Sequence, residues 1–279
     1  MVFTLFILLS ILEIVFYREY YLHQFVLEKI PIRIHVNGSR GKSSVTRLIA
    51  AGLRHGGFRT MAKTTGSSPR IIDTNGTDRE IQRLRSASIG EQVKLLRFFS
   101  KQKLDAVVME CMAVQPEYQW ISEHKMLKST MGVITNIRPD HIEEMGPTMT
   151  DITKSLGNTI PGNKAIIIAP SDHQNTLQKI ANDKNSKLVI TDPDEIESSY
   201  MEKFSHLEHK ENVALSLEVC MQLGIEKDTA LEGMLTARPD PGALSIKKIV
   251  FGEKHNFFVN AFAANDPQST LQIWEMVKK

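Results

Sequence analysis

The stretch His35–Ser44, HVNGSRGKSS, decides the fold expected for this chain. It follows a short apolar run, Ile32–Val36, and leads into Ser43–His55, where apolar residues recur at helical spacing. A glycine-bearing turn between a strand and a helix can bind phosphate through backbone N–H groups and the helix N-terminus. The long form of this motif fails, because Val36 stands where its first glycine belongs, whereas the short form G-x-x-G-K-S-S fits fully. We therefore predict a phosphate-binding loop, in preference to a plain glycine turn beside a surface lysine.

The residue types in this loop suit ATP. Gly38 and Gly41 allow the backbone to curl so that its N–H groups point at phosphate oxygens. Lys42 would reach the β- and γ-phosphates, and Ser43 would ligate Mg²⁺. The predicted ATP-binding segment comprises Asn37, Gly38, Ser39, Arg40, Gly41, Lys42, Ser43 and Ser44.

The rest of the chain alternates apolar runs with amphipathic segments. Further strands are predicted at Phe58–Ala62, Asp105–Cys111, Thr130–Asn136, Ala165–Ala169 and Lys187–Thr191. Further helices are predicted at Ile89–Lys101, Asp172–Asp183 and His209–Leu223. The polar stretch from Ala62 to about Arg85 is predicted to be loop. This order predicts an α/β fold with a mostly parallel sheet and ligands at the carboxyl ends of its strands.

Two more polar groups follow predicted strands. Glu110 ends the apolar run VVME, where a carboxylate could hold Mg²⁺ directly or through water, although a solvated strand-end charge is the plainer alternative. Its neighbour Cys111 is expected to be a buried core thiol. In Thr135–Thr148, TNIRPDHIEEMGPT, His141 could ligate a second metal or contact the transferring phosphate, with Asp140 orienting it. Alone, this histidine would count as a surface residue; with the loop and Glu110 it completes a nucleotide–metal site.

The N-terminal segment Val2–Tyr17 is apolar except for Thr4, Ser10 and Glu13. As a helix it would be about 24 Å long, slightly short of the roughly 30 Å hydrocarbon core of a membrane. Aromatic and then basic residues follow it, which favours a membrane anchor with the remaining chain on the cytoplasmic side. A buried core helix is one alternative. A cleaved signal peptide is another, but the segment lacks a basic start and a small-residue cleavage site.

Composition narrows the classes of function. The formal charge of the 279-residue chain is +2, and no local run of Lys or Arg indicates nucleic-acid binding. Two isolated cysteines exclude a disulfide framework or a zinc cluster and favour a reducing compartment. The chain breaks near Pro239–Gly242, after which strands at Ser245–Phe251 and Asn256–Ala261 and a helix at Gln268–Lys278 resemble the start of a second domain. The predicted divisions are an anchor and linker (1–29), an ATP-binding domain (30–243) and an incomplete C-terminal α/β domain (244–279).

Several motifs in order resemble the Mur ligase and folylpolyglutamate synthetase superfamily. They are GSRGKSS, the strand-end Glu110, TNIRPDHIE and HKENVALSL at His209–Leu217. The segments KTTG, ECMAVQPEY, ARPDPGAL and NAFAANDPQST narrow the resemblance to the ATP-dependent subunit of poly-γ-glutamate synthases, the CapB type. This family activates a carboxylate as an acyl phosphate with ATP, and an amine then attacks to form an amide.

The resemblance implies roles for individual residues. The implied catalytic residues are Lys42, Glu110 and His141, with Ser43, Glu110 and His141 at the metal. Asn212 would lie near the adenine, and Thr65 and Gly66 would face the acceptor substrate. Asn260, Asn265 and Asp266 would lie in the hinge strand and loop that close over the nucleotide, with Asn265 among the substrate contacts.

The chain departs from the family pattern in two places. Many members carry a carbamylated lysine after the D-H motif, but Lys154 is one or two residues out of register, with Ser155 or Leu156 at the expected position. The family's C-terminal domain is also a complete α/β unit, so we expect this chain to be a fragment or a truncated product.

These observations predict a membrane-associated, ATP- and Mg²⁺-dependent amide ligase that extends poly-γ-glutamate. The resemblance implies small membrane proteins of polymer synthesis and export as partners. Two alternatives remain: a related ligase that acts on a soluble precursor, and a nucleotide-binding subunit without catalysis. A P-loop GTPase or kinase is disfavoured, since its base-specificity motifs are missing.

Overall fold

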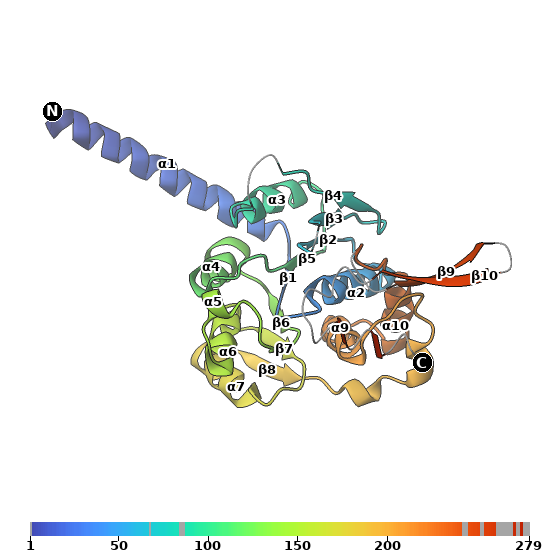
Figure 1. Ribbon diagram of the computed structural model, residues 1–279. Helices are drawn as coiled ribbons and strands as arrows, with labels where there is room; N and C mark the ends of the chain where they lie inside the picture. The colour runs from blue at the N-terminus through green and yellow to red at the C-terminus, as the bar shows by residue number, and fades with distance from the viewer. Residues whose placement is uncertain are drawn as a thin grey trace.

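The computed structural model describes residues 2–66, 68–83, 87–241, 245–251, 254–260, 270–271 and 274–275. Its centre is an eight-stranded sheet in the order β4-β3-β2-β5-β1-β6-β7-β8 (Figure 1). The strands are β1 (Ile32–Asn37), β2 (Thr60–Thr64), β3 (Arg70–Ile72), β4 (Asp78–Glu80), β5 (Ala106–Glu110), β6 (Met131–Ile134), β7 (Ala165–Ile168) and β8 (Lys187–Ile190). All neighbours pair in parallel except β2–β3 and β3–β4. The predicted mostly parallel α/β sheet is therefore confirmed.

Helices cover both faces of this sheet. Helices α2 (Lys42–His55), α9 (Lys210–Gln222) and α10 (Lys227–Leu235) pack together on one face (Figure 1). They bury alternate residues of the central strands, such as Ile34 and Val108. Residues of opposite parity, such as Val107 and Met109, face α3 (Glu91–Phe99). This double burial explains why the central strands are continuous apolar runs in the sequence.

The other face is completed by shorter elements. They are α4 (Pro116–Ile121), the π-helix η1 (Ser122–Leu127), α5 (Ile142–Met145), α6 (Met149–Gly157) and α7 (Gln174–Asp183). The 3₁₀-helix η2 (Pro193–Glu195) and α8 (Ser198–Met201) lead into α9. Sequence periodicity predicted α2, α3, α7 and α9 but not α4, α6 or α10.

The polar stretch predicted as loop contains an antiparallel hairpin, β3–β4. The tight turn Asp73–Thr77 joins its strands, with Gly76 at φ 80°. The loop prediction was wrong for these residues because strands of only three residues, RII and DRE, are too short to show an alternating pattern. Pairing of β3 with β2 makes them part of the sheet edge.

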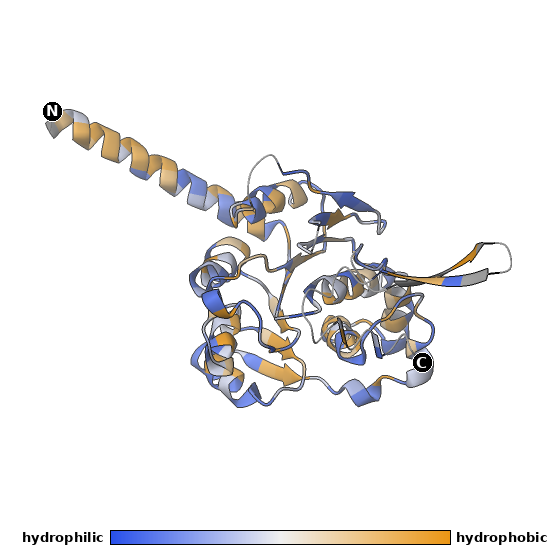
Figure 2. Cartoon of the chain, in the orientation of Figure 1, coloured by the Kyte–Doolittle hydropathy of each residue, from blue (hydrophilic) through white to orange (hydrophobic). Residues whose placement is uncertain are grey.

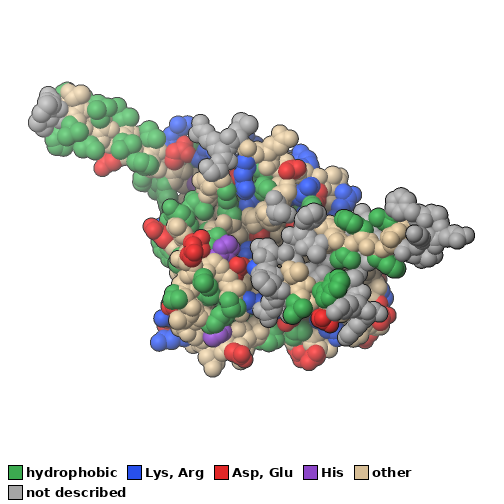
Figure 3. Space-filling view, in the orientation of Figure 1, with side chains coloured by type: hydrophobic (Ala, Val, Ile, Leu, Met, Phe, Trp, Pro, Cys, Tyr) green, Lys and Arg blue, Asp and Glu red, His purple; other side chains and the backbone are tan. Residues whose placement is uncertain are grey.

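Helix α1 (Val2–Glu28) projects from the body of the molecule (Figure 1). Only its C-terminal part is docked: Leu27 joins the core around α3, and His23 Nε2 lies 2.6 Å from the Met126 carbonyl. The projecting part is apolar and exposed, as Figures 2 and 3 show, with Phe3, Phe6 and Phe16 each at least 65% accessible. Within the described part of the chain, no helix combines the length and the apolar character that crossing a membrane requires.

Two strands near the C-terminus form a separate sheet. β9 (Ser245–Phe251) and β10 (Lys254–Asn260) pair antiparallel, as the sequence predicted for two strands in this region. The predicted helix Gln268–Lys278 lies mostly outside the described residues. The proposed domain boundaries at 29/30 and 243/244 stay predictions.

Candidate active site

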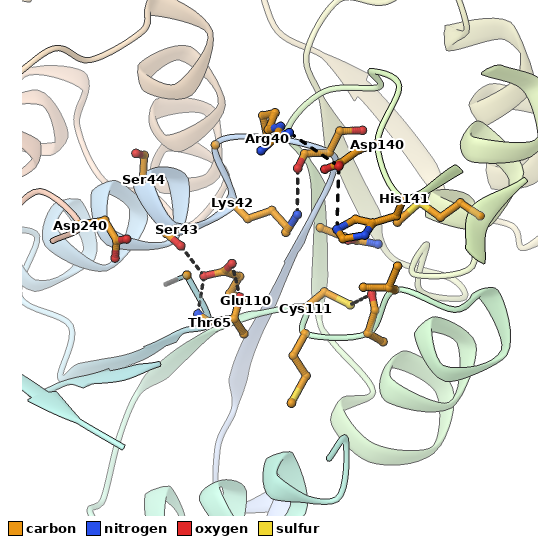
Figure 4. Close-up of a pocket in the computed structure, with 18 residues that line it drawn as sticks. Arg40, Lys42, Ser43, Ser44, Thr65, Glu110, Cys111, Asp140, His141 and Asp240 are labelled. Carbon is orange, nitrogen blue, oxygen red and sulfur yellow. Dashed lines mark hydrogen bonds and ion pairs between the residues drawn. The ribbon is translucent and has the colours of Figure 1, made fainter. Parts of the chain in front are cut away.

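Three adjacent strands place their carboxyl ends around one cavity. The phosphate loop follows β1, Glu110 ends β5, and the segment that contains Asp140 and His141 follows β6. Because β5 and β6 flank β1 on either side, these segments meet at the point where the strand order reverses. The cavity has a volume of about 500 Å³. Its walls are Asn37, Ser39, Arg40, Gly41, Lys42, Ser43, Ser44, Thr65, Gly66, Glu110, Cys111, Met112, Ala113, Val114, Asp140, His141, Met145 and Asp240 (Figure 4).

The loop has the backbone shape that phosphate binding needs. Gly38 and Gly41 have φ of 133° and 79°, a region that glycine adopts without strain. A Cβ on Gly38 would lie 2.1 Å from Thr135 Oγ1, so no larger residue fits there. The segment after β6 holds the loop: Asn136 accepts a hydrogen bond from Arg40 N at 3.0 Å and donates one to Arg40 O at 3.0 Å.

Lys42 begins helix α2 and turns back over the loop. Its Nζ donates hydrogen bonds to the carbonyls of Gly38 at 2.6 Å and Ser39 at 3.0 Å (Figure 4). The ammonium group is thereby held on the cavity side of the loop, next to the N-terminus of α2. A helix N-terminus and a lysine together favour an anion at this end of the cavity.

Opposite Lys42, three oxygen-bearing side chains converge. Ser43 Oγ donates to Glu110 Oε2 at 2.8 Å, the backbone N–H of Thr65 donates to the same oxygen at 2.7 Å, and Thr65 Oγ1 donates to Glu110 Oε1. Glu110 is only 2% exposed. Hydroxyl and carboxylate oxygens are the ligands that Mg²⁺ prefers, so this donor set fits that ion. Ser43, Thr65 and Glu110 would hold it.

His141 lines the same cavity but stands apart from Glu110. It has φ 46° and lies 3.9 Å from both Asp140 and Glu144, with 47% of its side chain accessible. Asp140 also lies 3.7 Å from Arg40. Among the residues described, no three acidic, histidine or cysteine side chains are close enough to hold a metal. Of the predicted metal residues Ser43, Glu110 and His141, the first two share a hydrogen bond and all three line the cavity, and the metal role of His141 stays a prediction.

Two predicted ATP contacts have side chains directed elsewhere. Asn37 Nδ2 donates to Gln119 at 2.9 Å and Thr159 at 3.2 Å, so it ties β1 to α4 and to the segment that follows α6. Asn212 lies behind the loop, because a Cβ on Gly41 would meet its Oδ1 at 2.8 Å. Its proposed contact with adenine stays a prediction. Asn265 and Asp266 lie outside the described residues.

The remaining predicted residues lie as follows. Gly66 lines the cavity beside Thr65, and Cys111 is buried, as expected, but also contributes to the cavity wall. Lys154 is exposed on α6 and is not part of the wall.

Sequence reasoning missed some of the wall. The cavity has an apolar side, which consists of Met112, Ala113, Val114 and Met145. Asp240 contributes a carboxylate from a segment about 200 residues after the phosphate loop in sequence. Burial raises the pKa of the Asp240 carboxyl, while Arg47 opposes this rise. The segment PDPG was predicted to be a break between domains and was part of one motif of the family resemblance, but Asp240 was given no role. Its proline–glycine composition predicts a turn but not a position in space.

Most of the chain that forms this cavity matches a known protein family. Residues 36–233 match the model of the Mur ligase middle domain, which spans the loop, Glu110 and His141. The chain belongs to the Mur ligase family. Residues 246–279 match the model of the C-terminal domain of the poly-gamma-glutamate synthase CapB.

The relatives of this Mur ligase family chain include two curated proteins. It is 41% identical over 258 residues to the capsule biosynthesis protein CapB of Bacillus anthracis, covering 91% of this chain and 55% of that protein. It is 39% identical over 259 residues to the PGA synthase CapB of Bacillus subtilis (strain 168), covering 92% and 66%. The chain therefore spans between about half and two thirds of the length of these relatives.

Solved structures share the fold at low sequence identity. Escherichia coli FolC in complex with DHPP and ADP superposes with a TM-score of 0.65 at 16% identity, covering 92% of this chain and 67% of that one. The bifunctional folylpolyglutamate synthase/dihydrofolate synthase of Yersinia pestis also gives a TM-score of 0.65 at 16% identity, covering 92% and 68%. The predicted α/β fold is thus shared with solved folylpolyglutamate synthase structures.

Proposed function

We propose that this chain is the ATP-dependent ligase part of a poly-γ-glutamate synthase, which activates a carboxylate as an acyl phosphate and joins it to glutamate. One observation carries the proposal. The loop with Lys42 and the oxygen cluster of Ser43, Thr65 and Glu110 line the same cavity. Membership in the Mur ligase family and similarity to the CapB proteins support the reaction and the polymer.

The cavity suits phosphoryl transfer, a reaction that proteins catalyse by positioning and charge. The loop N–H groups and Lys42 would bind the phosphates of ATP. When bound between the phosphates and the oxygen cluster, Mg²⁺ supplies charge neutralisation for the γ-phosphoryl group. The cluster offers only oxygen, which suits Mg²⁺ and also Mn²⁺, the ion present with AMPPNP in one folylpolyglutamate synthase/dihydrofolate synthase structure. His141 is a candidate contact for the transferred phosphate from the opposite wall.

The acyl group and the attacking amine must also enter this cavity. The apolar wall formed by Met112, Val114 and Met145 would exclude water from the acyl phosphate, which hydrolyses readily. Thr65 and Gly66 lie at the end of the cavity next to Glu110, where the resemblance predicts the acceptor substrate. We propose the γ-carboxylate of the growing polymer as the activated group and free glutamate as the amine.

We also propose that the chain works at the cell membrane, with its cavity on the cytoplasmic side and with small membrane proteins of the export complex as partners. The exposed apolar surface of α1 supports this location, because a monomeric soluble protein rarely leaves such a surface uncovered. The sequence contains no run of Lys or Arg that would favour nucleic acid as a partner.

ADP release by the membrane-bound protein with Mg-ATP tests the ligase function. We expect poly-γ-glutamate and glutamate together to stimulate release, and Lys42→Ala to abolish the stimulation. Lys179→Ala is the matched control, because Lys179 is an exposed lysine on α7, remote from the cavity wall in sequence and not part of it. Hydroxylamine in place of glutamate should trap the acyl phosphate as a hydroxamate.

The alternatives give different results in this assay. A ligase for a soluble precursor would release ADP with a folate or a cell-wall peptide but not with the polymer. A nucleotide-binding subunit without catalysis would bind ATP tightly, with no stimulated release and no hydroxamate. Either result would overturn the proposed substrate or the proposed reaction, respectively.

A further inference from the structure

The cavity contains a second carboxylate, which the metal cluster does not use. Asp240 lies in the segment after α10 and reaches the cavity beside Gly66 (Figure 4). A Cβ on Gly66 would lie 2.8 Å from Asp240 Oδ2 and 3.4 Å from Ser43 Oγ. Oδ2 therefore faces the end of the cavity where Thr65 and Gly66 form the wall. His141 lies at the other end of the group of side chains in Figure 4.

The other oxygen of this carboxylate, Oδ1, is held by a buried arginine. Arg47, which is buried and follows Ser43 by one helical turn on α2, approaches Asp240 Oδ1 with Nη2 at 3.2 Å. Arg47 Nη1 binds Asp78 on β4 at 2.8 and 3.0 Å and approaches the Arg238 carbonyl at 3.4 Å. One guanidinium thus sets the position of Asp240 relative to the helix that carries the phosphate loop.

The two carboxylates of this part of the wall, Glu110 and Asp240, differ in the hydrogen bonds that their oxygens accept. Both oxygens of Glu110 accept hydrogen bonds from Ser43 or Thr65. For Asp240, Arg47 takes Oδ1, and no hydrogen bond from a described residue reaches Oδ2. A negatively charged oxygen with free acceptor capacity, in a wall that is mostly buried, favours a cationic hydrogen-bond donor.

We propose that Asp240 binds the ammonium group of the incoming amino acid and so positions the amine for attack on the acyl phosphate. This inference rests on the proposed ligase function and adds a substrate-binding residue to it. The bound ammonium loses one proton to water, and its nitrogen then forms the C–N bond while the C–O bond to phosphate breaks. Phosphate leaves with the electron pair of that bond and takes the second proton from the nitrogen, which leaves the amide N–H.

Asp240→Asn, assayed in the membrane-bound protein with its partners, tests this role. The substitution keeps the shape of the side chain and a hydrogen bond acceptor for Arg47 but removes the charge. We expect kcat/KM for glutamate to fall about 10- to 100-fold, the usual effect of losing a hydrogen bond to a charged group. Formation of the hydroxamate from hydroxylamine, which is largely neutral at pH 8, should stay within about twofold of wild type. Asp240→Glu should recover part of the glutamate activity.

Asp73→Asn is the matched control. Asp73 pairs with Arg79 at 2.9 Å, contacts neither Arg47 nor the cavity wall, and so this variant should retain the wild-type kcat/KM for glutamate. Three results would overturn the proposal: equal losses in Asp73→Asn and Asp240→Asn, equal losses with glutamate and hydroxylamine, or a raised Mg²⁺ requirement with an unchanged KM for glutamate. If the wild-type protein forms no hydroxamate, the ligase function itself is wrong and the role of Asp240 is rejected with it.

Discussion

At the scale of single residues, the phosphate loop depends on glycine for reasons of space as well as conformation. Gly38 combines a φ of 133° with contact to the backbone and side chain of Thr135, so a Cβ has no room there. Gly57 offers a matched comparison, because it also has a positive φ, of 88°, but no atom lies within 4 Å of a Cβ placed on it.

Gly38→Ala is therefore expected to lose ATP binding and to destabilise the fold by more than Gly57→Ala. The strain of a positive φ alone costs about 1–2 kcal/mol for alanine, which both variants share. Only Gly38→Ala must also displace the segment that begins at Thr135, which holds Arg40 through Asn136. Calorimetric titration with Mg-ATP and thermal unfolding would measure both effects. Wild-type ATP affinity in Gly38→Ala would show that the loop does not bind the phosphates.

At the scale of elements, a buried ion pair joins the strand before the loop to the π-helix η1. His35 Nδ1 on β1 lies 2.8 Å from Glu123 Oε2, and both side chains are at most 1% accessible. Burial alone would lower the pKa of His35, but Cys111 and Glu123 outweigh it and raise the pKa to about 10. His35 therefore stays protonated at neutral pH, and its positive charge neutralises the Glu123 carboxylate.

This pair predicts how stability depends on pH. Because the folded state binds the proton more tightly than the unfolded state, the contribution of His35 is complete below pH 6.5. It declines as the pH rises, by at most about 1.4 kcal/mol per pH unit, and is lost above about pH 10. Urea unfolding between pH 6 and 10, in reducing buffer, should show this decline.

The matching variant is His35→Asn, which should be less stable than wild type at pH 6 and should lack this part of the pH dependence. Cys111, Glu123 and His124 are the titratable neighbours, so the same measurement on Glu123→Gln would separate the pair from the thiol. Parallel pH profiles of wild type and His35→Asn would contradict the assignment of a protonated imidazole.

At the scale of the whole molecule, α1 divides into a docked part and a projecting part. Glu19 pairs with Arg97, and Leu27 and Ile30 enter the core around α3, whereas the first part of the helix is exposed. The body of the protein therefore does not need the projecting part for its fold.

Removal of residues 2–16 is expected to leave the unfolding temperature unchanged and to reduce binding to lipid vesicles about tenfold or more, since amphiphilic binding scales with apolar area. Vesicle sedimentation would measure this. The double variant Phe257→Ser and Phe258→Ser is the control, because it removes exposed apolar side chains from the β9–β10 hairpin instead. Equal vesicle binding by the wild-type and shortened chains would reject α1 as the membrane contact.

The phosphate loop, the strand-end Glu110 and the parallel sheet could be predicted from short stretches of sequence. A buried parallel strand, a glycine turn and a helix start occupy consecutive residues, so the loop at Asn37–Ser44 and the strand-end Glu110 are recognisable from the order of residues alone. The long apolar runs also determined the parallel sheet, because strands buried on both faces leave no polar alternation.

Contacts between segments that are far apart in sequence could be seen only in the tertiary structure. The hairpin β3–β4 pairs with the edge of β2, and Asn37 hydrogen-bonds to Gln119 and Thr159. Arg47 holds Asp240 at the cavity wall, and His141 and Glu110 reach the same wall from β6 and β5, on either side of β1. Such contacts depend on packing between elements far apart in the chain, a physical constraint that no local sequence pattern records.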